Sequence, residues 1–336
     1  MRLLSEADVE RLIDPTLAIQ CAEDAYVQQA LGETLEPGRL DLRRSTPKAG
    51  VLVVAGFGHD SDTFVAKTNA HAWPVAGGPR VNRSLLVLWD MAQARALALM
   101  AATNFNDHRT AAGFAAAAKV LAAPNASVLA IFGAGKLALP SLTYVAAVRP
   151  IRRVLIVGRD PARARALAVQ ARRCEALASI EIDAIEDPAF AAAQADVIVT
   201  VTTSDTPVFP GQVVREGTLV VLGGANRPSA REVDDALIRR AQIFTDHLQG
   251  ALGKGGDLKI PIEQGVISRD AFAGDIGAFI RGPQTIPFHA GVRAFKSIGI
   301  ALQDLVLARA LLARAEEQGQ GTWFDANGAS DSGSLA

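Results

Sequence analysis

The chain reads Ser127-Val-Leu-Ala-Ile-Phe-Gly-Ala-Gly-Lys-Leu-Ala138, and Arg153-Val-Leu-Ile-Val-Gly-Arg-Asp160 follows after a short interval. This order of residue types predicts a strand, a glycine turn, a helix and a second strand. Gly133, Gly135 and Ala138 fit the pattern G-x-G-x-x-G/A directly behind an apolar run, the context in which it indicates a dinucleotide-binding turn. Glycine lets the backbone approach a pyrophosphate, and the amides at the start of the helix favour anions. The alternative is a glycine-rich turn in an ordinary α/β domain.

The end of the second strand is where such folds select their cofactor, because the residue about 20 positions past the third small residue meets the adenosine ribose. Gly158 occupies this position and Arg159 follows it, whereas folds that prefer NAD place Asp or Glu there. Glycine leaves room for a 2′-phosphate and arginine supplies a positive charge, so we expect NADP(H) in preference to NAD(H). Asp160 could bind the ribose instead. Asp160-Pro161 also has the pattern of a helix N-cap, the role we favour.

Composition restricts the partners of the chain. Its 336 residues predict about two domains, and the near balance of 34 basic and 35 acidic residues gives no overall field for nucleic acid or an anionic membrane. No apolar run reaches about 18 residues, and the N-terminus turns acidic too early for a signal peptide. The histidines and cysteines lack metal-ligand spacing, so we expect no metal site. A small-molecule substrate and a cytoplasmic location are therefore expected.

The first third of the chain predicts two helices followed by a meander. Ser5 with Asp8 resembles a capping box, Asp14 caps the next helix and Gly32 ends it. Short β-branched runs at 51–54, 63–66 and 85–88 are separated by Gly and Pro. An alanine-rich helix is then expected from Asn106 to about residue 123, where it would connect two domains.

Strand and helix patterns alternate after the glycine turn. Strands are expected at 154–157, 196–201 and 218–222, with a further candidate at 243–245. This alternation predicts an α/β fold in which a Rossmann-type domain with a doubly wound parallel sheet, at 123–294, joins a mixed α/β domain at 1–122. Residues from Gly291 onward have helical apolar spacing, and a C-terminal helix at about 295–320 should return to the first domain. Residues 321–336 predict a mobile tail, part of which Trp323 and Phe324 could pin.

Five motifs resemble those of one protein family. They are Phe64-Val-Ala-Lys-Thr68, Arg109-Thr-Ala-Ala112, Gly133-Ala-Gly135, Gly224-Ala-Asn-Arg-Pro228 through Arg231-Glu-Val-Asp234, and Phe295-Lys-Ser-Ile-Gly299 with Asp304. Together they are similar to the ornithine cyclodeaminase/mu-crystallin family over nearly the whole chain. The resemblance implies that the first domain binds substrate and forms a homodimer through its sheet, and that the active site lies between the domains.

The resemblance also implies a set of functional residues. Lys67 and Asn226 would be catalytic, and Arg39, Lys67 and Arg109 would bind a substrate carboxylate. The positions expected to contact the cofactor are Thr110, Gly133, Ala134, Gly135, Lys136, Leu137, Gly158, Arg159, Thr202, Gly224 and Ala225.

The three basic residues also have interpretations from the sequence itself. Arg109 would lie in the first turn of a helix, where a cation is disfavoured by about 0.3–1 kcal/mol, so a nearby anion such as a substrate carboxylate would offset the strain. Alternatively, Asp107 pairs with it at the surface. Lys67 closes a strand of buried type, and the alternative is a solvated lysine at a strand end. Arg39 could clamp a carboxylate bidentately, or have no ligand role.

Asn226 is the main departure from the family pattern. Cyclodeaminases of the family carry a general-base Asp at this position, and an amide cannot exchange a proton at neutral pH. The reductase branch of the family, which includes mu-crystallin-like ketimine reductases, lacks that Asp and prefers NADPH. Alternatively, Asn226 serves only a turn, since asparagine tolerates left-handed backbone. A second departure, Asn104-Phe-Asn-Asp107, replaces the threonine-bearing lead of the family.

We therefore expect an NADPH-dependent oxidoreductase that reduces a small cyclic imine carboxylate, or forms an amino acid from its keto or imino precursor. One alternative is an NAD-dependent ornithine cyclodeaminase, which converts ornithine to proline and ammonia. A further alternative is a protein that binds NADPH and a ligand without turnover.

Overall fold

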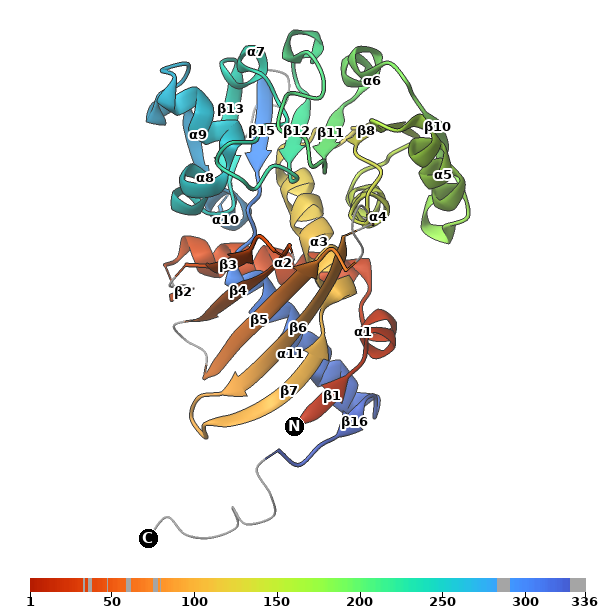
Figure 1. Ribbon diagram of the computed structural model, residues 1–336. Coiled ribbons are helices and arrows are strands. Elements are labelled where there is room, and N and C mark those ends of the chain that lie inside the picture. The colour runs from red at the N-terminus through yellow and green to blue at the C-terminus, as the bar shows by residue number, and fades with distance from the viewer. Residues whose placement is uncertain are drawn as a thin grey trace. The chain divides into compact units, whose positions relative to one another are not determined.

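The computed structural model describes residues 1–32, 34–35, 38–46, 48–58, 62–74, 78, 80–282 and 291–326. The chain divides into two compact units (Figure 1). The first comprises Met1–Arg109 and Ile300–Ala336, and the second is Thr110–Gly299. The division falls within helix α3 (Thr103–Leu121) and directly before helix α11 (Ala301–Glu317), whereas the sequence placed it near 122 and 294.

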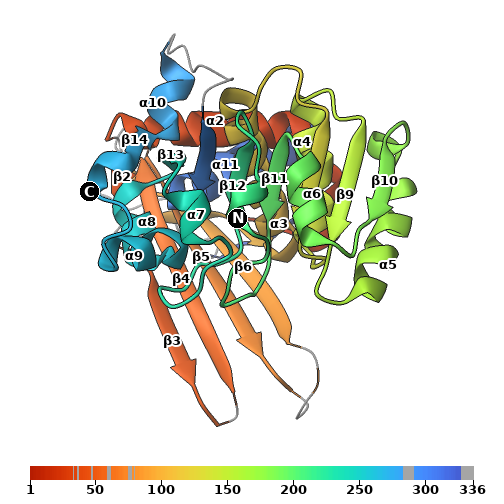
Figure 2. The same cartoon turned by 90° about the horizontal axis from the view of Figure 1, so that it is seen from above.

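The first unit contains a mixed sheet in the order β16-β1-β7-β6-β5-β4-β2, with β3 also paired to β4. Its strands are β1 Arg2–Leu4, β2 Thr34–Leu35, β3 Leu40–Arg44, β4 Ala49–Gly58, β5 Thr63–Ala72, β6 Val81–Asp90, β7 Arg95–Ala101 and β16 Thr322–Trp323. Strands β3 to β7 pair antiparallel with their neighbours in sequence, as the predicted meander requires. Figure 2 shows β3, β4, β5 and β6 as a row of long arrows.

Helices cover one face of this sheet. Helix α1 spans Glu6–Leu12 and α2 spans Pro15–Ala30, and both begin at the predicted caps, Ser5 and Asp14. Helix α11 packs on α2 and on β4 and β5. Because side chains alternate between the faces of a strand, every second residue of β5 points into this core.

The second unit is built on a sheet in which every pair of neighbours is parallel, in the order β10-β9-β8-β11-β12-β15-β13-β14. Its strands are β8 Val128–Phe132, β9 Arg153–Val157, β10 Glu181–Ala184, β11 Val197–Thr200, β12 Leu219–Leu222, β13 Ala241–Thr245, β14 Phe272–Asp275 and β15 Val292–Lys296. Chain order reverses at β8, which lies between β9 and β11. This is the switch point of a doubly wound Rossmann-type sheet, so the predicted fold class is confirmed.

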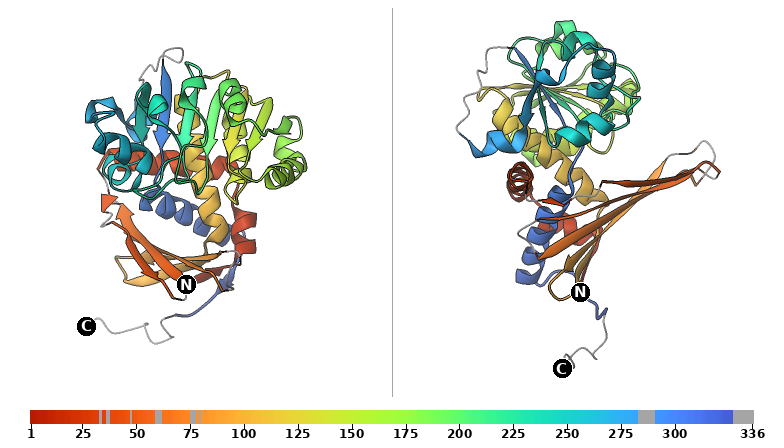
Figure 3. Two further views of the ribbon diagram at one scale, coloured as in Figure 1. Left: turned by 45° about the horizontal axis from the view of Figure 1, so that its top comes forward. Right: turned by 90° about the vertical axis from the view of Figure 1, so that its left-hand side faces the viewer.

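Helices lie on both faces of the second sheet (Figure 3). Besides the C-terminal part of α3 they are α4 Ala138–Val148, α5 Pro161–Arg172, α6 Pro188–Gln194, α7 Asp235–Ile238, α8 Leu248–Lys254, α9 Gly256–Glu263 and α10 Ile276–Arg281, with short 3-10 turns at η1 Glu175–Leu177, η2 Gly211–Val213 and η3 Arg269–Ala271. Within the described part of the chain, no helix combines the length and the apolar character needed to cross a membrane.

Two predicted elements begin in the wrong place. Helix α3 starts at Thr103 rather than at Asn106, because Glu6 accepts the first amides, Thr103 N at 2.9 Å and Asn104 N at 3.0 Å. Arg109 is therefore past the first turn, and the argument from the helix dipole does not apply to it. The predicted helix from Gly291 is also wrong at its start, because 292–296 form strand β15 between β12 and β13.

The predicted mobile tail is ordered where it begins. Strand β16 pairs antiparallel with β1, and the N-terminal amine donates to Phe324 O at 2.8 Å. Residues 327–336 of that tail lie outside the described residues.

Candidate functional site

A buried ammonium group is the centre of the first unit's polar cluster. Lys67 lies in the middle of β5 between Val54 of β4 and Leu86 of β6, and all three are buried. Its Nζ donates to Asp304 Oδ1 at 2.6 Å and to Asn106 Oδ1 at 3.1 Å. Lys67 is 0% exposed, so it is not the solvated strand-end lysine of the alternative interpretation.

Arg109 joins the same cluster from helix α3. Its Nε lies 3.1 Å from Asp304 Oδ1, and its Nη2 donates to Asn106 Oδ1 at 2.9 Å. Asp304, in the first turn of α11, thus accepts from the lysine and also faces the guanidinium. Two of the three predicted carboxylate-binding residues are therefore brought together.

The electrostatics of the cluster favour an additional anion. The pKa of Lys67 is lowered to about 7, first by burial and then by the Arg109 charge. Asp304 opposes this shift, and the Arg39 charge adds to it. Arg39, which precedes β3, thus lies close enough to act on the lysine electrostatically. Lys67 and Arg109 both contact the one carboxylate of Asp304, and an uncompensated buried charge is unfavourable. A bound carboxylate would reduce this imbalance.

The glycine turn of the second unit has the geometry that a pyrophosphate needs. Gly133 has φ of +117°, and a Cβ there would lie 2.7 Å from Val201 O, so only glycine fits. A Cβ on Gly135 would meet no atom within 4 Å, which leaves the backbone approachable. Ala138 is 0% exposed, as close packing of helix α4 on its strand requires. The three small residues therefore fit a dinucleotide.

The end of β9 lies beside this turn. A Cβ on Gly158 would be 3.6 Å from Ala134 Cβ, and Arg163 Nη2 donates to Ala134 O at 3.4 Å. Asp160 accepts from Ala162 N at 2.9 Å and caps α5, which confirms the favoured role for this residue. Arg159 is exposed. Arg159 therefore follows directly after β9, and Arg163 of α5 contacts the glycine turn. Arg163 was not among the predicted cofactor residues.

One buried carboxylate joins the loops after β11 and β12. Glu232 accepts from Thr202 N at 2.7 Å, Gly224 N at 2.8 Å and Ala225 N at 3.0 Å, and also from Thr200 Oγ1 at 2.9 Å. Burial and the Asp257 charge raise the pKa of Glu232. Three predicted cofactor-contacting residues are therefore fixed at the carboxyl edge of neighbouring strands, where ligands of doubly wound sheets bind.

A second buried lysine, Lys296, supports the loop after β12. Lys296 Nζ donates to Asp257 Oδ2 at 2.9 Å and to Ala225 O at 2.8 Å, and Glu232 N donates to Asp257 Oδ1 at 2.5 Å. Asn226 is exposed, its Nδ2 donates to Gly223 O at 3.3 Å, and its backbone is not left-handed. The interpretation that left-handed backbone explains this asparagine is therefore wrong.

The remaining predicted cofactor residues lie in the second unit as well. Thr110 is in helix α3, Lys136 is exposed just before α4, and Leu137 is the N-cap position of α4. In the described ranges, no group of three or more His, Cys, Asp or Glu side chains could hold a metal ion.

The sequence interpretation gave Asn106, Glu232 and Asp257 no role in these clusters, and it named Asp304 only as part of a family motif. Asp304 is 237 residues from Lys67, and Glu232 is 30 residues from Thr202. The sequence feature that could have identified the carboxylates is a charged residue within an apolar stretch, since a charge that is buried there requires a partner.

Comparison with known proteins gives the family. The sequence model described as the ornithine cyclodeaminase/mu-crystallin family matches residues 1–319. A Delta(1)-pyrroline-2-carboxylate reductase of Paracoccus denitrificans is 34% identical over 294 residues, 85% of this chain and 90% of that protein.

Two solved structures share the fold over nearly the whole chain. The Thermococcus litoralis Delta(1)-pyrroline-2-carboxylate reductase, in complex with NADH and L-proline, has a TM-score of 0.88 at 28% identity and covers 96% of this chain and 100% of its own. An archaeal alanine dehydrogenase dimer with bound NAD has a TM-score of 0.87 at 26% identity, covering 97% and 99%. With the match over residues 1–319, these likenesses show that the chain belongs to the ornithine cyclodeaminase/mu-crystallin family.

Proposed function

We propose that the protein is an NADPH-dependent reductase of a small cyclic imine carboxylate, or forms an amino acid from its keto or imino precursor. The observation that carries the proposal is the cluster around Lys67, where this lysine and Arg109 share the single carboxylate of Asp304. Such a cluster suits a substrate with a carboxylate next to the reacting carbon. The names of the Paracoccus and Thermococcus relatives support the same substrate class.

Each residue of the cluster has a distinct role in the proposed reaction. Arg109 and Arg39 hold the substrate carboxylate, since a guanidinium pairs with it bidentately. A bound nicotinamide would supply the hydride that the imine carbon takes up. The electron pair of the C=N bond then moves to nitrogen, and Lys67 donates the proton that this nitrogen takes up. A pKa of about 7 suits Lys67 to proton transfer near neutral pH.

The preference for NADPH is proposed from the edge of the glycine turn. Gly158 places no carboxylate at the ribose position, since even a Cβ there would lie 3.2 Å from Asp160 O. Arg159 is exposed, and Arg163 reaches the turn at Ala134 O. Asp160 is engaged as a helix cap rather than presented to a ribose. The solved relatives hold NADH and NAD, so this preference rests on the residues of this chain alone.

Ornithine cyclodeamination is the second candidate, because a lysine cyclodeaminase structure shares the fold at 26% identity with a TM-score of 0.81. That reaction would need a general base in the loop after β12. The loop presents Asn226, whose amide cannot take a proton at neutral pH. The reductase is therefore favoured.

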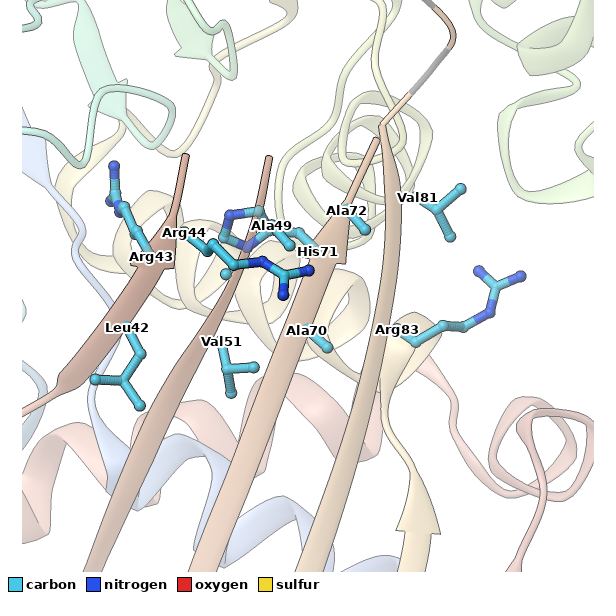
Figure 4. A pocket seen from close by; sticks show the side chains of 11 residues that line it. Leu42, Arg43, Arg44, Ala49, Val51, Ala70, His71, Ala72, Val81 and Arg83 are labelled. Atoms are coloured by element: carbon cyan, nitrogen blue, oxygen red, sulfur yellow. The ribbon is translucent and has the colours of Figure 1, made fainter. Parts of the chain in front are cut away.

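We also propose that the partner is a second copy of the chain, seated on the face of the first unit's sheet that is opposite its helices. Leu42 is 56% exposed, Leu85 51% and Trp89 37%, and an apolar patch on one face indicates an interface. Figure 4 shows Leu42, Val51 and Ala70 on three neighbouring strands beside a hollow of about 520 Å³. The alanine dehydrogenase relative is a dimer. Sedimentation of a monomer at micromolar concentration would contradict this, and Leu85→Asp should weaken the dimer.

The function is tested by three assays on one preparation. NADPH oxidation is followed with 1-pyrroline-2-carboxylate, ammonia release is followed with ornithine and NAD, and NADPH binding is followed by its fluorescence. The proposal expects imine-dependent NADPH oxidation without ammonia release. Ammonia release from ornithine would establish the cyclodeaminase, and NADPH binding without turnover of any imine or keto carboxylate would establish a binding protein.

A further inference from the structure

The hydrogen bonds of Lys67 leave one donor available for a substrate. An ammonium group has three N–H donors, of which Asp304 takes one and Asn106 takes another. No third acceptor reaches Nζ within the described ranges. The two acceptors therefore fix the direction of the third N–H bond.

The charges that face Lys67 come from three separate parts of the first unit. Arg39 precedes β3, Arg109 belongs to α3 and Asp304 to α11. The two guanidiniums disfavour a charged lysine, and Asp304 is the one anion among these groups. Its carboxylate is itself favoured where it stands, because the first turn of a helix attracts negative charge.

We infer that Asp304 is a positioning residue that keeps Lys67 protonated between two guanidiniums and directs its third N–H toward the imine nitrogen. The inference deepens the proposed function and rests on it. Asn106 directs the same ammonium group, but as a neutral amide it adds no charge. Asp304 therefore controls both the protonation state of the lysine and the direction of its N–H bonds, whereas Asn106 controls only their direction.

Two substitutions should move the protonation of Lys67 in opposite directions. Asp304→Asn removes the anion but keeps an acceptor of the same shape, and loss of a neighbouring opposite charge shifts a pKa by about 1–3 units. Asn106→Asp adds an anion 3.1 Å from Nζ. In the wild type, kcat/KM for imine reduction should decline as pH rises through about 7, because the neutral amine cannot donate its proton.

The measurement is kcat/KM for NADPH-dependent reduction of 1-pyrroline-2-carboxylate between pH 5.5 and 9. The decline should move to lower pH in Asp304→Asn, with a loss of about tenfold or more at pH 7.5, and to higher pH in Asn106→Asp. A uniform loss at every pH in Asp304→Asn, with the decline unmoved, would overturn the inference. Asp183→Asn is the control, since it removes a carboxylate from the ion pair with Arg153 in the second unit, outside both lysine clusters, and should leave the position of the decline unchanged.

Direct titration separates this inference from the proposed function. The side chain of Lys67 is observed by carbon NMR on lysine-labelled protein, with Lys67→Arg to assign its signal. A lower pKa in Asp304→Asn and a higher one in Asn106→Asp would support the inference even if no imine were reduced. An unmoved pKa in Asn106→Asp would contradict it, and this second variant retains both original ion-pair partners.

Discussion

The two units each bury a lysine against an aspartate, and the surroundings give the two pairs different properties. Lys67 and Asp304 are joined by the guanidinium of Arg109, and the Arg39 charge also acts on the lysine, so cations outnumber the anion. Lys296 and Asp257 are joined by a second carboxylate, Glu232, so anions outnumber the cation.

The partners of the two lysines indicate their different uses. Lys296 uses its donors on Asp257 and on a backbone carbonyl, and the carboxylates of its cluster accept backbone amides from the loops after β11 and β12. Lys67 bonds only side chains among the described residues, and each of the two lysines uses two of its three donors. A buried ion pair is therefore not informative by itself. The excess charge around it and the kind of partner distinguish a pair that fixes loops from one suited to bind an anion.

The largest effect is expected from removing the first lysine. Lys67→Ala should lower kcat/KM for imine reduction by about 10²–10⁴-fold, the usual contribution of a general acid. NADPH affinity should be retained, because the glycine turn is in the second unit. Steady-state kinetics and NADPH fluorescence titration measure the two properties, and unchanged turnover would exclude a catalytic role for Lys67.

Matched substitutions of the two lysines should differ in stability. Lys296→Met leaves Asp257 and Glu232 without a cation among the described residues, and an unpaired buried charge costs about 3–5 kcal/mol. Lys67→Met should cost less, because Arg109 remains 3.1 Å from Asp304. Urea unfolding followed by circular dichroism gives the free energy of unfolding of both variants. A larger decrease in Lys67→Met than in Lys296→Met would contradict the difference proposed between the clusters.

The difference between these clusters could be predicted from the sequence only in part. The glycine turn was recognised because its pattern is local, and the cap at Asp160 was predicted for the same reason. Lys67 and Arg109 were identified through family resemblance, but their partners were not, because Asp304 approaches from 237 residues away. Helix α3 was misplaced because its cap is Glu6, 97 residues before it. Strand β15 was taken for helix because short apolar runs fit both periods.

A smaller effect is expected at the cofactor edge of the second unit. A guanidinium on a 2′-phosphate contributes about 1.5–3 kcal/mol, so Arg159→Ala should weaken NADPH by about 10- to 150-fold and hardly change NADH. Arg165→Ala is the control, since this exposed arginine of the same helix, α5, pairs with Glu186 at 3.0 Å. Fluorescence titration with both cofactors measures the affinities. If Arg159→Ala weakens NADPH and NADH equally, or if the wild type prefers NADH, then Arg159 does not bind a 2′-phosphate and Asp160 becomes the candidate ribose ligand.

The central claim is that the Lys67 cluster binds a carboxylate, and calorimetric titration tests it most directly. Pyrrole-2-carboxylate is a planar carboxylate that cannot be reduced at an imine, and pyrrole is the matched ligand without the charge. With NADPH present at pH 8, binding of the carboxylate should be accompanied by uptake of a fraction of a proton by Lys67. A bound anion favours the charged form of this lysine, whose pKa is about 7. Titration in two buffers of different ionisation enthalpy measures the uptake, and Arg109→Ala should weaken binding. Equal affinity for pyrrole, or binding without proton uptake, would contradict the account.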